Sequence, residues 1–151
     1  MRFARVRPED DPLPLELARR AIPYTPFDRP LSETTVALVS TAGVHLKSQE
    51  PFDVLGDGSY RTIPSDTDVS DLTITHDHYD HSAGDRDVNS VFPIERLREM
   101  VADGTLKGLN PEFFGMMGYT LKLKQVLDET APAIAKKIER SSTDLVLLTG
   151  G

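Results

Sequence analysis

The chain has 151 residues, enough for one domain with a hydrophobic core, and 38% of them are hydrophobic. Its net charge of -7 argues against nucleic acid or an anionic membrane as the main partner, because phosphate binding needs excess Lys and Arg. No apolar run approaches the roughly 18 residues of a membrane span, and no apolar stretch follows the basic N-terminus, so we predict a cytoplasmic protein. The absence of cysteine excludes disulfides, thiolate metal sites and cysteine nucleophiles within these residues.

Residues 1–33 are predicted to form an irregular N-terminal arm, because six prolines interrupt them. One short helix, about Leu15 to Ala21, fits between these prolines. Residues 34–151 are predicted to form a single α/β domain.

Three short apolar runs are predicted to be strands, at residues 34–40, 71–75 and 144–148. They are rich in β-branched and aliphatic residues without alternation, which is typical of strands covered on both faces of a parallel sheet. Helices are expected between them, so the pattern predicts an α/β fold with a mostly parallel sheet and flanking helices, a Rossmann-like three-layer arrangement.

One predicted helix runs from Ile94 to about Asp103, and a longer one covers residues 120–140. Pro132 either kinks the longer helix or lies in the first turn of a second helix capped by Thr130. Residues 108–118 are predicted to be a loop whose Phe and Met side chains pack in the core. The alternative is an exposed apolar loop at 113–117 that contacts another subunit.

All four histidines follow predicted strands. His45 comes soon after the first strand, and three more histidines fall within six residues after the second. Ligands in α/β sheets bind beyond the carboxyl ends of the strands, so we expect these residues and Thr149-Gly150-Gly151 to meet there.

The histidine-rich loop at residues 76–81 allows three interpretations. Its imidazoles and carboxylates suit a divalent metal such as zinc or iron, and the predicted ligands are His76, His78, Asp80 and His81. Imidazole also titrates near neutral pH and can move protons, and the predicted catalytic residues are His45, His76, His78 and His81. The third interpretation is structural: the rings only bond to carboxylates and backbone. For His45 considered by itself, this structural interpretation is favoured.

Arg61 lies in a long polar excursion between the first two predicted strands, and long loops are often functional. It is the predicted anchor for a substrate carboxylate, with a surface ion pair as the alternative.

The spacing His76-x-His78-x-Asp80-His81 matches the HxHxDH signature of the metallo-β-lactamase superfamily. That fold needs further histidine and aspartate ligands downstream, and no histidine follows His81. We therefore disfavour this resemblance.

Several motifs together resemble the selenoprotein B family, the substrate-specific subunits of glycine, sarcosine, betaine and D-proline reductases. In the family's order they are residues 41–47, 49–53, 56–61, 76–81, 87–97 and 144–148. The resemblance implies reductive carbon–nitrogen cleavage of a small amino-acid-like substrate by a selenolate or thiolate, with electrons from a thiol donor. It also implies other reductase subunits, or self-association, as partners.

In that family the reactive residue follows the last of these strands, where this sequence reaches Gly151 without a cysteine. Two explanations stay open: a selenocysteine codon read as stop, or a complete short relative whose chemistry rests on the histidine-rich loop. The codon after Gly151 and the intact protein mass would separate them. A non-catalytic metal-binding or partner-binding module with the family fold is a further alternative.

Overall fold

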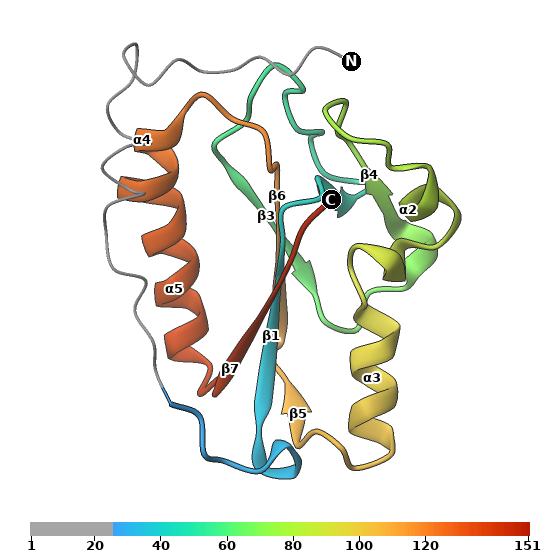
Figure 1. The fold of residues 1–151 in the computed structure, drawn as a ribbon, viewed down its shortest axis with the longest axis vertical. Helices are drawn as coiled ribbons and strands as arrows, with labels where there is room; N and C mark the ends of the chain where they lie inside the picture. Colours follow the sequence, from blue (N-terminus) through green and yellow to red (C-terminus); the bar gives the residue numbers. More distant parts are fainter. Residues whose placement is uncertain (1–25) are drawn as a thin grey trace.

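The computed structural model describes residues 26–151 (Figure 1). The helix predicted at about Leu15 to Ala21, and most of the predicted arm, lie outside these residues. The described part begins with an extended segment and a single 3-10 turn, η1 (Leu31–Glu33).

A five-stranded sheet forms the centre of the molecule. Its strands are β1 (Thr35–Ser40), β3 (Tyr60–Pro64), β5 (Gly108–Leu109), β6 (Glu112–Met116) and β7 (Leu145–Thr149). β1 pairs in parallel with β5, β6 and β7, and β3 pairs antiparallel with β6. β7 pairs with residues 36–40 along one edge of β1. The other edge of β1 is therefore shared by β5 and β6. The sheet is mostly parallel, as predicted.

β1 is buried on both faces, as its unbroken apolar run predicts. Val36 and Leu38 belong to a core cluster with residues of α3 (Ile94–Ala102), whereas Ala37 and Val39 pack with residues of α5 (Ala131–Arg140). Figure 1 shows α3 and α5 on opposite sides of the sheet. The three-layer prediction is therefore confirmed.

The predicted helix at 94–103 is α3, and Gly104 follows it with a φ of +79°, a conformation that glycine adopts easily. The longer predicted helix consists of α4 (Leu123–Gln125), the π-helical segment η4 (Val126–Thr130) and α5. Pro132 lies in the first turn of α5, where the wider π turn before it accommodates the missing N–H. The predicted capping role of Thr130 is wrong, because its hydroxyl donates to the carbonyl oxygen of Gly58 at 2.5 Å.

The predicted second strand is confirmed as β4 (Leu72–Ile74), but its predicted place in the parallel sheet is wrong. It pairs antiparallel with β2 (Val44–Leu46) in a separate two-stranded sheet. Gly43, with a φ of +77°, turns the chain out of β1, and its N–H and carbonyl bond to Met116 and Thr75. A Cβ at Gly43 would lie 2.4 Å from the Thr75 carbonyl oxygen, so the turn requires glycine.

The predicted loop at 108–118 is also corrected, because it contains β5 and β6. Phe113 and Phe114 are 0% exposed, which confirms core packing and rules out the exposed subunit contact suggested for 113–117. The strand was missed because Gly115 interrupts its apolar pattern. A Cβ at Gly115 would lie 1.9 Å from the Val44 carbonyl oxygen, so glycine lets β6 approach β2.

Short helical elements complete the described chain. They are η2 (Val69–Asp71), α2 (Ser82–Arg86) and η3 (Val88–Ser90). No helix among residues 26–151 combines the length and the apolar character needed to cross a membrane.

Candidate functional site at the histidine-rich loop

The histidine-rich loop, residues 76–81, connects β4 to α2 and is held against the ends of β1 and β7. The Tyr79 hydroxyl donates to the Ala42 carbonyl at 3.0 Å. Its ring packs against Gly151, where an added Cβ would lie 2.5 Å from the nearest ring atom. The Thr41 N–H donates to the Thr149 carbonyl. The loop and the end of β7 therefore lie side by side, although β4 is not part of the parallel sheet from which this prediction was made.

His76 is the most buried of the loop histidines, at 8% exposed. Its Nδ1 accepts a hydrogen bond from the backbone N–H of His78 at 3.0 Å. Burial lowers the His76 pKa, and the neighbouring His78 lowers it further. His76 is therefore a neutral imidazole near neutral pH, with its proton on Nε2.

His78 and His81 each lie beside a carboxylate. Nδ1 of His78 is 2.5 Å from Asp77 Oδ1, and Nδ1 of His81 is 2.9 Å from Asp85 Oδ2, although neither contact has hydrogen-bond alignment. The His78 ring also stacks on Tyr119, with centroids 3.5 Å apart and planes 13° apart. When either ring is protonated, its carboxylate stabilises the positive charge.

Three side chains of the loop could hold a cation. His76, Asp77 and His78 each offer a ligand atom, and these atoms lie within 4.8 Å of one another. The donor set suits zinc or iron. Metal binding at either ring nitrogen of His76 would break the hydrogen bond from the His78 N–H. Nδ1 would lose this bond directly, and Nε2 could bind only after its proton had moved to Nδ1.

The predicted metal ligands are only partly brought together. His76 and His78 lie in the three-residue group, to which the structure adds Asp77, whereas Asp80 and His81 lie outside it. Asp80 Oδ1 accepts from the backbone N–H of Ser82 at 3.0 Å, and bonds to Ser82 lower the Asp80 pKa. This carboxylate helps to begin α2.

His45 is apart from the other histidines, since it lies within β2 and is 2% exposed. Its Nδ1 is 2.8 Å from the Leu46 carbonyl, which only accepts, so Nδ1 carries the proton. Nε2 then accepts from the Thr75 hydroxyl at 2.8 Å. His45 reaches the loop only through Thr75, the residue before His76.

Arg61, the predicted carboxylate anchor, already bonds to residues of the 50–59 loop. Its guanidinium donates to the carbonyls of Glu50 and Pro51 and to the Ser59 hydroxyl, and it lies 3.6 Å from Asp57. It also covers the Phe52 ring, 4.4 Å from the centroid. These contacts hold the 50–59 loop in place.

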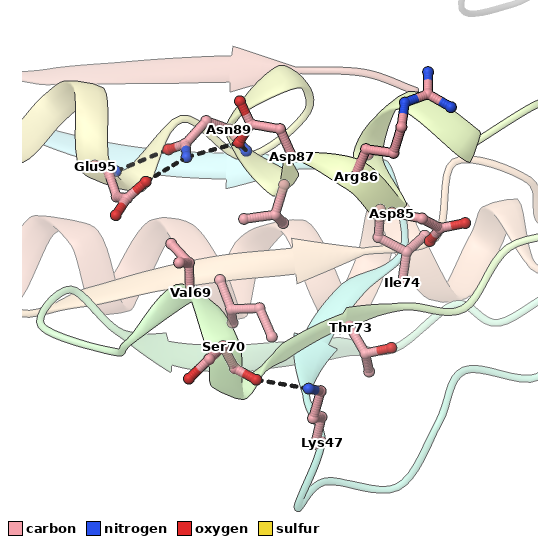
Figure 2. A pocket seen from close by; sticks show the side chains of 13 residues that line it. Lys47, Val69, Ser70, Thr73, Ile74, Asp85, Arg86, Asp87, Asn89 and Glu95 are labelled. Carbon is pink, nitrogen blue, oxygen red and sulfur yellow. Dashed lines mark hydrogen bonds between the residues drawn. The ribbon is translucent and has the colours of Figure 1, made fainter.

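A cavity of about 420 Å³ lies against β4 and α2, the two elements that the histidine-rich loop connects, although residues 76–81 themselves do not line it (Figure 2). Its charged lining residues are Lys47, Asp85, Arg86, Asp87 and Glu95, and its apolar lining is Val69, Leu72, Ile74 and Val88. The Asn89 amide donates to Asp87 at 2.9 Å and to Glu95 at 2.7 Å, which fixes two of the carboxylates. Asp85 belongs both to the cavity and to the His81 pair. Sequence reasoning missed this cavity because its residues are scattered from 47 to 95.

Comparison with known proteins identifies the family of this chain. The profile of the glycine/sarcosine/betaine reductase selenoprotein B family matches residues 12–151. The chain is 40% identical over 128 residues to D-proline reductase subunit gamma of Acetoanaerobium sticklandii. It is 29% identical over 133 residues to glycine reductase complex component B subunit gamma of Carboxydothermus hydrogenoformans. No solved structure shows significant similarity to the chain.

The two alignments differ in how much of each relative they include. Each covers 85% of this chain, but the chain spans 53% of the D-proline reductase subunit and 30% of the glycine reductase subunit. Each relative therefore holds a large region without a counterpart in these 151 residues. Both relatives are named as subunits of reductases.

Proposed function

The chain belongs to the glycine/sarcosine/betaine reductase selenoprotein B family, and from this premise we propose that it is a reductase subunit acting in reductive carbon–nitrogen cleavage of a small amino-acid-like substrate. The observation that carries the proposal is the 40% identity with a D-proline reductase subunit over 85% of the chain. The 151 residues contain no cysteine, so the selenol or thiol that the reaction requires comes from outside them.

The histidine-rich loop supplies protons in this proposal. Reductive cleavage takes up an electron pair and two protons: the carbon–nitrogen bond breaks, one proton goes to nitrogen and one to carbon. A thiol donor supplies the electrons. His78, which lies beside Asp77, donates the proton to the leaving nitrogen, and His81, which lies beside Asp85, donates the proton to the carbon. The neutral His76 offers Nε2–H as a hydrogen-bond donor that orients the substrate.

The cavity beside the loop supports an amino-acid-like substrate. Figure 2 shows Lys47 on one side of it and Asp87 and Glu95 on the other. These opposite charges complement a molecule with both a carboxylate and an ammonium group. The role of Arg61 as a carboxylate anchor stays a prediction, because its guanidinium holds the 50–59 loop.

The experiment replaces His78 in the protein assembled with the other reductase components. His78→Ala should lower turnover about a hundredfold or more, because general acid catalysis contributes on that order. Circular dichroism should show an intact fold, since the half-buried His78 ring contacts mainly Tyr119 and the loop. Lys137→Gln, which removes an exposed ion pair between α5 and Glu112 of β6, is the control and should keep its activity. Undiminished turnover of His78→Ala would refute the proposal.

Metal binding is a second candidate function, favoured by the grouping of His76, Asp77 and His78. Elemental analysis of the chain after incubation with zinc or iron tests it. One equivalent of metal that is lost in the double variant His76→Ala/His78→Ala would support a metal site. A wild-type chain that binds no metal would refute the metal site and would leave proton transfer as the proposed function of the loop.

A further inference from the structure

The outer edge of β7 has no neighbouring strand among the described residues, and β7 exposes apolar side chains. β7 lies beside β1, and no strand among residues 26–151 pairs with its other edge. Three consecutive apolar side chains are exposed there: Val146 is 38% exposed, Leu147 is 36% and Leu148 is 74%. Figure 1 shows β7 as the red strand that crosses the sheet beside β1.

The sequence of β7 is that of an interior strand. Residues 145–148 are four apolar residues without alternation, the same pattern as residues 36–39 of β1, which are at most 7% exposed. The register between β1 and β7 places Leu145 and Leu147 on the α3 face and Val146 and Leu148 on the α5 face. Such a pattern is typical of a strand covered on both faces. β7 thus leaves Leu147 exposed on one face, and Val146 and Leu148 exposed on the other.

The opposite margin of the sheet shows the contrast. There β3 carries the charged Arg61 and ends with Pro64, features that protect an edge strand from further pairing. β7 has neither a charge nor a proline. The β3 margin of the sheet is therefore protected from pairing with a further strand, whereas the β7 margin is suited to accept one.

We propose that the outer edge of β7 pairs with a strand from the polypeptide region that family members have in addition to the part matched by these 151 residues. The chain spans about half of one relative and less of the other, so the family holds this additional polypeptide. The free N–H and C=O groups of β7 would hold the added strand by backbone hydrogen bonds, and the apolar side chains of β7 would set its register and add to the affinity. The added unit must also cover Val146 and Leu148 on the α5 face.

The location of β7 gives this pairing a consequence for the site. Gly150 and Gly151 follow β7 directly, and Gly151 lies against Tyr79 of the histidine-rich loop. A strand added to β7 would therefore place its polypeptide next to that loop. The inference rests on family membership and not on the proposed reaction, and binding can be measured without activity.

The test co-expresses the full 151-residue chain with the region of D-proline reductase subunit gamma that it does not match, so that the two polypeptides can fold together. Hydrogen exchange of the complex should show new protection at residues 145–149. Leu148→Lys should weaken binding by about tenfold or more, because a charge replaces a leucine that the complex would bury. Leu121→Lys is the matched control, since Leu121 is 63% exposed outside the sheet, and it should change binding by less than about twofold.

Three outcomes would overturn the proposal. The first is no complex between the two co-expressed polypeptides, and the second is equal weakening by the two lysine variants. The third is a dimer of the 151-residue chain, seen by light scattering, that Leu148→Lys dissociates. This last result would assign the edge to a second copy of the chain.

Discussion

The backbone N–H of His78 donates to Nδ1 of His76 at 3.0 Å, so the conformation of the loop selects the tautomer of its most buried histidine. A protonated His76 ring would carry hydrogen on both nitrogens and would lose this bond. Burial opposes the charge as well, which is why the His76 pKa lies below its ordinary value of 6.5.

The pH dependence of stability follows from this shift. Because the folded state lowers the His76 pKa, the unfolded chain takes up the proton first as the pH falls. The stability contributed by neutral His76 is therefore complete above about pH 6.5 and is lost as the pH falls toward the folded-state pKa. We predict that the free energy of unfolding, measured with urea, decreases from pH 7.5 to pH 5.

The control for this prediction is His76→Gln, whose side-chain oxygen can accept the same bond from the His78 N–H. Its stability should depend less on pH between 7.5 and 5 than that of the wild type. The described aspartates with lowered pKa values titrate below this window, since their ordinary value is 3.8. Parallel curves for the two proteins would contradict the assignment to His76.

The stack between His78 and Tyr119 predicts a role for an aromatic ring from the segment before α4. Tyr119→Leu should destabilise the fold by about 0.5–1.5 kcal/mol and should increase carbethoxylation of His78 by diethyl pyrocarbonate. Tyr119→Phe keeps the ring and should react like the wild type. Equal reactivity of His78 in all three proteins would show that the stack does not shield it.

Gly115 is predicted to be required for contact between the two sheets. Gly115→Ala would place a Cβ 1.9 Å from the backbone oxygen of Val44, which cannot move without disturbing β2. We expect a loss of about 3 kcal/mol or more in denaturant unfolding. Gly108→Ala in β5 is the control, since its Cβ would have its nearest neighbour at 4.0 Å, and it should cost under about 1 kcal/mol. Similar losses for both would refute this account.

Replacing Arg61 should loosen the 50–59 loop. Arg61→Lys keeps the charge but loses the planar fork that reaches Glu50, Pro51 and Ser59, so hydrogen exchange across this loop should increase severalfold. Kinetics of the assembled reductase would test the predicted anchoring role separately. A higher KM with unchanged loop exchange would favour anchoring of a substrate carboxylate, whereas faster exchange with unchanged KM would favour loop support alone.

The tertiary structure also separated residues that the sequence presents as equivalent. His45 and His76 each follow an apolar run, yet both ring nitrogens of His45 bond within the small sheet. The difference comes from Gly43, which turns the chain so that residues 44–46 pair with β4. A local sequence pattern cannot show this, because the pairing joins segments about 30 residues apart.

By itself, the sequence determined the strands at 34–40 and 144–148, the helix at 94–103, the cluster of histidines and the family resemblance. These depend on local hydrophobic pattern and on motifs that are read directly from neighbouring residues. Only the tertiary structure decided that β4 leaves the main sheet, that residues 112–116 are a buried strand, and that Asp77 joins His76 and His78. It also showed that β7 has an interior strand's sequence at an exposed edge. These features depend on contacts between distant segments, where close approach at Gly43 and Gly115 and the pairing of backbone groups override local preference.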